Sequence, residues 1–86
     1  MIVHVGSVLH AYTGGKSAVE ASGRTVRAVL ADLERRFPGL RFRVIDEQER
    51  IRTHMRIYVG NRPVSDLASA VKAEDELHIL GALSGG

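Results

Sequence analysis

Residues 25–39, TVRAVLADLERRFPG, decide the fold class of this 86-residue chain. Apolar side chains recur there at the three- and four-residue spacing of one helix face, which predicts an amphipathic helix. The apolar stripe consists of Val26, Val29, Leu30, Leu33 and Phe37. Thr25 is the expected N-cap, and Pro38 and Gly39 end the helix. A single amphipathic helix needs a sheet to cover its apolar face, so the pattern predicts an α+β domain.

Strand patterns on both sides of the helix supply that sheet. Residues 2–9 and 17–21 are predicted to form a hairpin around the turn at 12–16. Residues 55–59 and 77–80 show the alternation of half-buried strands. The order strand, strand, helix, strand, strand predicts a mixed sheet with the last strand beside the first. The helix stripe is expected to pack on Val3, Val5, Val19, Ile57, Leu77 and Ile79.

Three further segments are less regular. Residues 40–44 are short and ambiguous, and residues 46–53 are polar enough to form a surface loop or a small hairpin. Pro63 excludes a regular central strand around it, because proline cannot donate to a ladder of backbone hydrogen bonds. We expect these segments to connect the main elements without adding a second domain.

Composition limits the function classes. The chain has 44% hydrophobic residues and no cysteine, which excludes disulfides, thiolate metal sites and a cysteine nucleophile. No apolar run approaches the roughly 20 residues of a membrane-spanning helix, so we expect no membrane association and a cytoplasmic location. One domain over residues 1–80, followed by a flexible tail over 81–86, has little room for a deep catalytic cleft.

Arginine carries most of the positive charge. The net charge is only +2, although the pI is about 9.5. The central arginines are Arg35, Arg36, Arg41, Arg43, Arg50, Arg52 and Arg56. Acidic residues interleave with them, so a solvated, self-neutralised face is favoured over a nucleic-acid site.

The sequence ends in Leu83, Ser84, Gly85 and Gly86. Glycine has no side chain, so a diglycine segment can thread a narrow channel in a partner enzyme. The Gly86 carboxylate is therefore a candidate chemical handle that a partner could activate with a nucleotide. The alternative is a passive chain end.

The four histidines are candidate metal ligands. They are His4, His10, His54 and His78. His4 and His78 are expected on neighbouring strands, but two histidines with no carboxylate nearby make a poor metal site. The sequence therefore predicts surface histidines and no metal.

Several segments, taken in order, resemble the MoaD/ThiS family of prokaryotic sulfur carriers. These segments are 12–15, 19–26, 33–40, 57–61 and 75–80 with the final diglycine. The resemblance implies the β-grasp fold of ubiquitin-like proteins. Within the family, the hairpin at 13–15 and the serine–glycine pair before the helix look most like the cysteine-biosynthetic carriers, the CysO type. Gly81 stands where many relatives have proline, which is expected to loosen the tail.

The resemblance implies a carrier that is not itself an enzyme and binds no cofactor. An adenylating enzyme would use ATP to convert the Gly86 carboxylate to an acyl-adenylate, and a sulfur donor would then form a thiocarboxylate. The implied acceptor is a pyridoxal-phosphate cysteine synthase. Two alternatives stay open: the small subunit of molybdopterin synthase, inserted into its large subunit, and a protein modifier joined to lysines. Glycine in place of proline at position 81 argues against the first alternative, the molybdopterin synthase subunit.

A docking patch is expected beside the tail. If Leu77 and Ile79 face the core, His78 and Leu80 face outward. Arg56 and Tyr58 would flank them on a neighbouring strand. An exposed leucine there suits partner docking, as in ubiquitin-like proteins, although single exposed leucines are also common.

Overall fold

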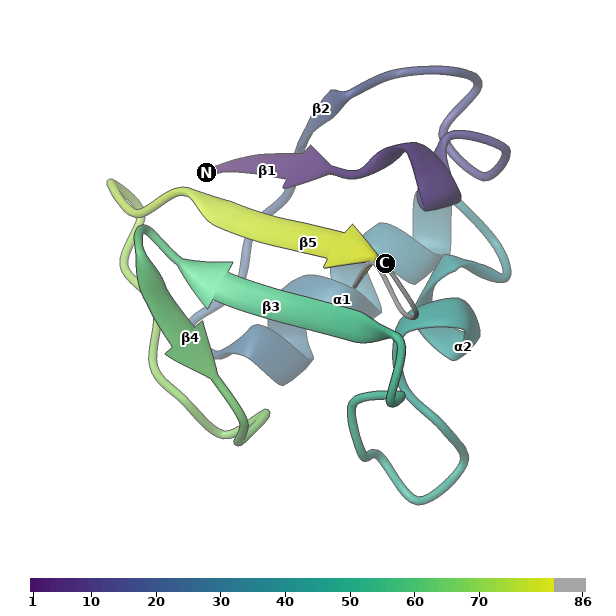
Figure 1. The fold of residues 1–86 in the computed structure, drawn as a ribbon. Helices are drawn as coiled ribbons and strands as arrows, with labels where there is room; N and C mark the ends of the chain where they lie inside the picture. Colours follow the sequence, from purple (N-terminus) through teal and green to yellow (C-terminus); the bar gives the residue numbers. More distant parts are fainter. Residues whose placement is uncertain (82–86) are drawn as a thin grey trace.

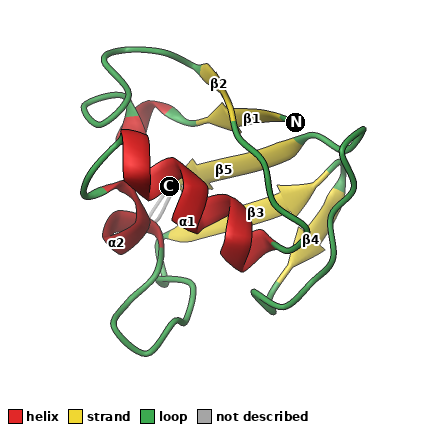
Figure 2. Ribbon diagram, turned by 180° about the vertical axis from the view of Figure 1, so that it is seen from behind, coloured by secondary structure: helices red, strands yellow, loops and turns green. Residues whose placement is uncertain are grey.

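The computed structural model describes residues 1–81, which form a five-stranded mixed sheet crossed on one face by a helix (Figures 1 and 2). The strand order is β2-β1-β5-β3-β4, and the central strands β1 and β5 are parallel while the other pairs are antiparallel. The elements are β1 (Ile2–Val5), the 3-10 helix η1 (Ser7–Leu9), β2 (Ala18–Glu20), α1 (Val26–Arg36), α2 (Leu40–Val44), β3 (Met55–Val59), β4 (Arg62–Val64) and β5 (Leu77–Gly81). The predicted fold class, with the last strand beside the first, is confirmed.

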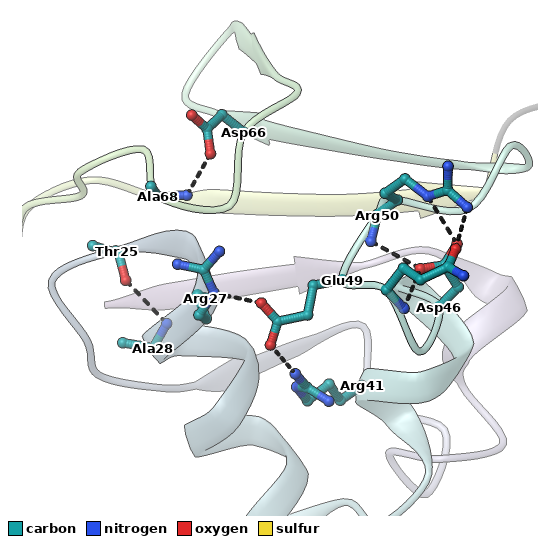
Figure 3. Close-up of polar contacts among 10 residues, drawn as sticks. Thr25, Arg27, Ala28, Arg41, Asp46, Glu49, Arg50, Asp66 and Ala68 are labelled. Atoms are coloured by element: carbon teal, nitrogen blue, oxygen red, sulfur yellow. Dashed lines mark hydrogen bonds and ion pairs between the residues drawn. The ribbon is translucent and has the colours of Figure 1, made fainter.

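Helix α1 starts and buries its side chains as its sequence pattern predicts. The Thr25 hydroxyl accepts a hydrogen bond from the Ala28 amide at 3.1 Å, which caps the N-terminus (Figure 3). The stripe residues Val26, Val29, Leu30 and Leu33 are fully buried, whereas Phe37 is only partly buried. Figure 2 shows α1 lying across the sheet face that they cover. The six predicted sheet partners are also buried, namely Val3, Val5, Val19, Ile57, Leu77 and Ile79.

The first strand is shorter than predicted. A strand over residues 2–9 was expected, but β1 ends at Val5. The Gly6 amide still donates a hydrogen bond to the Ile79 carbonyl at 2.8 Å. The Leu9 amide then donates to the Gly6 carbonyl at 3.0 Å, which closes a turn. This 3-10 turn carries Leu9 into the core, where its side chain is fully buried. Burial of one leucine therefore overrides the local strand pattern.

The connecting segments adopt defined structures. Residues 45–51 close a small hairpin through the bridge between Ile45 and Ile51, one of the two structures expected there. Pro63 lies in β4 at the sheet edge, where a missing amide donor is tolerated. Within residues 1–81, the helices are too short or too polar to cross a membrane.

The ambiguous segment 40–44 forms the short helix α2, and Glu34 explains its position. The Glu34 carboxylate accepts hydrogen bonds from the Gly39 amide at 3.0 Å and from the Arg41 amide at 3.0 Å. These bonds hold two backbone donors at the start of α2, where Gly39 adopts a positive φ of 95°. The Gly39 and Arg41 amides lower the pKa of the Glu34 carboxyl, because they stabilise its charged form.

This geometry predicts an acid-sensitive contribution to stability. The pKa of Glu34 lies below its ordinary value of 4.5 in the folded chain. Its stabilisation is therefore complete above that value and is lost as the pH falls through the folded pKa. Urea unfolding at a series of pH values should show a loss of stability on acidification that is smaller in Glu34→Gln. Glu47→Gln changes the same group on an exposed loop and should keep the wild-type profile; identical profiles for all three proteins would contradict the prediction.

Candidate functional site

Four residues predicted to form a docking patch lie together on the sheet face opposite α1. The antiparallel register of β3 and β5 pairs Arg56 with Leu80 and Tyr58 with His78. Leu77 and Ile79 are fully buried against the helix, so alternation turns His78 and Leu80 to the other face. We call Arg56, Tyr58, His78 and Leu80 the outer-face block. The structure thus places them as neighbours, while their docking role stays a prediction.

Side chains of the outer-face block combine apolar and polar character. Leu80 is 38% exposed, and Tyr58 and His78 are half-buried. The Arg56 guanidinium donates to the carbonyls of Thr53 and Met55, both at 2.9 Å, which holds its charge at the start of β3. The exposed leucine is flanked by an anchored arginine and a tyrosine, and arginine and tyrosine are residue types enriched in protein interfaces.

The outer-face block lies at the end of the described chain. β5 runs through Leu80 to Gly81, so the predicted tail follows directly from the block. The candidate tail residues Leu83, Ser84 and Gly85, and the candidate acceptor Gly86, lie outside the described residues.

Gly81 is part of the sheet. It was expected to begin the tail, but it is the last residue of β5 and pairs with Met55 of β3. A Cβ at this position would lie 2.9 Å and 3.0 Å from the two γ-carbons of Val8. The absence of a side chain therefore lets η1 approach β5, while the expected effect of Gly81 on the tail concerns residues 82–86, which lie outside the described residues.

Within the described residues, four of the seven central arginines contact a neighbouring acid, namely Arg35, Arg36, Arg41 and Arg50. Glu49, at a positive φ of 60°, joins Arg27 at 2.9 Å and Arg41 at 3.0 Å, as Figure 3 shows. Asp46 pairs with Arg50 at 3.5 Å across the same loop (Figure 3). These contacts agree with the self-neutralised face that the sequence predicts.

The same pattern holds at the C-terminal end of α1. Asp32 pairs with Arg36 at 2.9 Å and also contacts Arg35. The Ser22 amide, more than either arginine, lowers the pKa of the Asp32 carboxyl. The arginines that make these contacts therefore serve local structure, which gives little support to a nucleic-acid interface.

A groove beside Gly81 was not anticipated from the sequence. It measures about 660 Å³ and is lined by Val8, Arg43, Arg52, His54 and Gly81 among others. Arg52 lies over the Phe42 ring at 4.5 Å and donates from Nε to the Phe42 carbonyl at 2.7 Å. The groove forms because η1 and the loop after α2 meet at the end of β5, which periodicity alone cannot show.

His4 and His78 are neighbours, as expected, but the premise that no carboxylate lies near them is wrong. The parallel register of β1 and β5 pairs the two histidines, whose rings stack at 4.6 Å. Glu76 reaches the pair, with Oε1 2.5 Å from His4 Nε2. The sequence could have predicted Glu76 beside the histidines, because residues 76 and 78 share one face of an extended segment.

Comparison with known proteins identifies the family. The ThiS family matches residues 3–86. The chain belongs to the ThiS family. The sulfur carrier protein CysO of Mycobacterium tuberculosis is 36% identical over 89 residues, which cover 98% of this chain and 96% of that relative. The CysO protein of Mycobacterium bovis matches equally well. The predicted resemblance to the MoaD/ThiS family, and to its CysO type, is confirmed.

Solved structures agree with this ThiS-family assignment. A chain of the Amycolatopsis orientalis BexX/CysO complex has a TM-score of 0.91 at 35% identity, covering 99% of this chain and 98% of that one. Mycobacterium tuberculosis CysO has a TM-score of 0.90 at 33% identity, covering 95% and 98%. SAMP1 of Haloferax volcanii has a TM-score of 0.77 at 26% identity, covering 100% and 98%. The β-grasp architecture is thereby confirmed.

Proposed function

We propose that this ThiS-family chain is a sulfur carrier, not itself an enzyme, whose Gly86 carboxylate becomes a thiocarboxylate that supplies sulfur for cysteine biosynthesis. The observation that carries the proposal is similarity over nearly the whole chain to sulfur carrier proteins of the CysO type, at 36% identity over 98% of its length. The match to the ThiS family also includes the final diglycine.

The chemistry of the chain suits this role. A carboxylate is a poor acyl donor, so an adenylating enzyme would first use ATP to join AMP to Gly86. A sulfur donor would then displace AMP and leave a C-terminal thiocarboxylate. The chain has no cysteine, so no thiol of its own can carry the sulfur. Tethering the sulfur to a folded domain lets an acceptor hold it in position and gain from proximity.

Two partners follow from the proposal. The adenylating enzyme would dock on the outer-face block, because the block combines exposed Leu80 with anchored Arg56 directly before the tail. The second partner is a sulfur-accepting enzyme, for which a pyridoxal-phosphate cysteine synthase is the best candidate. A CysO protein of Amycolatopsis orientalis has been solved in complex with BexX, which supports docking by a carrier of this fold.

The decisive experiment is the intact mass of the chain after incubation with its adenylating enzyme, ATP and a sulfur source. We expect a gain that matches replacement of one oxygen by sulfur. The variant that lacks Gly86 should show no gain, because it has lost the acceptor carboxylate in its proper position. Omission of ATP is the matched control and should also abolish the gain. Loading of the shortened variant, or no loading by an enzyme active on another carrier, would overturn the proposal.

A protein modifier is the second candidate. It is favoured by the structural similarity to SAMP1, a small archaeal modifier protein, with a TM-score of 0.77. Diglycine remnants on lysines of other proteins, absent when the gene is deleted, would support this function. A stable complex with a molybdopterin synthase large subunit would instead favour the third alternative.

A further inference from the structure

Three metal-binding side chains converge on the outer face of the sheet, beside the outer-face block. The register of β1 and β5 places His4 next to His78, and Glu76 precedes His78 by two residues on the same side. The nitrogen and oxygen ligand atoms of all three residues lie within 4.8 Å of one another. Among residues 1–81, this is the one group of three such side chains that comes together.

The donor set defines the class of ligand. Two imidazole nitrogens and one carboxylate oxygen are the three protein ligands of many open Zn²⁺ sites, in which a fourth position stays free. We propose that His4, Glu76 and His78 bind one divalent transition-metal ion of the Zn²⁺ type. Neither the ThiS-family match nor the proposed sulfur chemistry at Gly86 assigns this site.

The backbone holds two of the ligands in place before any metal arrives. β1 and β5 are the central strands of the sheet, so the Cα positions of His4 and His78 are fixed by ladders on both sides. His4 Nε2 and Glu76 Oε1 already lie 2.5 Å apart. In a tetrahedral site with bonds of about 2.0–2.1 Å, ligand atoms lie about 3.3 Å apart. Because all the ligand atoms lie within 4.8 Å of one another, a side-chain displacement of about 1.5 Å brings the third ligand to this spacing.

The surroundings leave room for an ion. Ala18 of β2 pairs with His4 and contributes only a methyl group on that side. His4 and His78 are half-buried and Glu76 is exposed, so a metal ion can reach the site from solvent. Their stacked rings, with an interplanar angle of 11°, must turn toward a common point on binding. Metal binding should therefore change the signals of both rings together.

Zn²⁺ titration of the full-length chain without a polyhistidine tag tests the site. Calorimetry should show one saturable site per chain. In parallel nuclear magnetic resonance spectra, the ring signals of His4 and His78 should shift, while those of His10 and His54 should not. Zn²⁺ should also raise the melting temperature, because a ligand that binds the folded state stabilises it.

Variants separate this site from nonspecific binding. His4→Gln, His78→Gln and Glu76→Gln should each weaken Zn²⁺ binding by about 10-fold or more, since even the outer partners of metal ligands contribute that much. His54→Gln, a histidine outside the cluster, should bind as the wild type does. Glu76 is exposed, so Glu76→Gln should keep the fold even if a strand variant does not. Unchanged affinity in these three variants, loss in His54→Gln, or no saturable binding would overturn the proposal.

Discussion

Replacing Leu80 with serine is expected to lower kcat/KM for adenylation of this chain by about 30-fold or more, on the proposed function. Leu80 is 38% exposed near the end of β5, close to the tail that would enter the active site of the adenylating enzyme. We expect Leu80 to act as a hot spot of this interface; truncating a hot spot costs about 2 kcal/mol or more, and each 1.4 kcal/mol is a factor of ten. Steady-state release of pyrophosphate measures the effect.

The same sheet face offers a matched control. Ile2 is 41% exposed on β1, outside the outer-face block, so Ile2→Ser removes similar apolar surface elsewhere. This variant should retain near wild-type kcat/KM, and both variants should unfold at urea concentrations close to the wild type. Equal effects of the two changes, or full activity of Leu80→Ser, would remove the block from the docking surface. A double change of Leu80 and Leu83 to serine extends the test into the tail.

Truncating Leu33 to alanine is expected to destabilise the domain by about 2–5 kcal/mol. Leu33 is fully buried in α1 and packs into the core between the helix and the sheet. Domains of this kind are stable by only about 5–15 kcal/mol, so the loss should shift the unfolding curve strongly. Urea denaturation followed by circular dichroism gives the free energy of unfolding.

Leu80→Ala is the control for the Leu33 experiment, because it removes the same atoms from a partly exposed site. It should cost much less than Leu33→Ala, since its side chain leaves no closed cavity. Similar losses at the two positions would show that α1 does not cover the sheet in solution as Figure 2 shows.

Local sequence patterns determined the main elements and their faces. The apolar stripe of α1 obeys helical periodicity over three turns, so its buried side could be predicted without any partner. Alternation in β5 likewise turned Leu77 and Ile79 inward and His78 outward. The resemblance of several segments, taken in order, to the ThiS family predicted the β-grasp fold. Each of these segments is a short stretch of sequence, so each could be recognised without the tertiary structure.

Two features that the sequence left open or predicted wrongly, the start of α2 and the end of β1, depend on medium-range contacts. α2 is short, and its start depends on the Glu34 carboxylate accepting backbone amides from Gly39 and Arg41. The early end of β1 depends on the burial of Leu9. Neither effect is visible in periodicity, since both depend on which groups the rest of the fold places nearby.

The sequence by itself determined one amphipathic helix, the strand faces and the family to which the chain belongs. Only the tertiary structure decided what meets at the ends of the central strands. Parallel pairing of β1 with β5 joins Glu76 to His4 across 72 positions of sequence, and η1 sets Val8 against Gly81. Such contacts follow from strand register and close approach, which are properties of the assembled sheet, so no pattern within a single segment contains them.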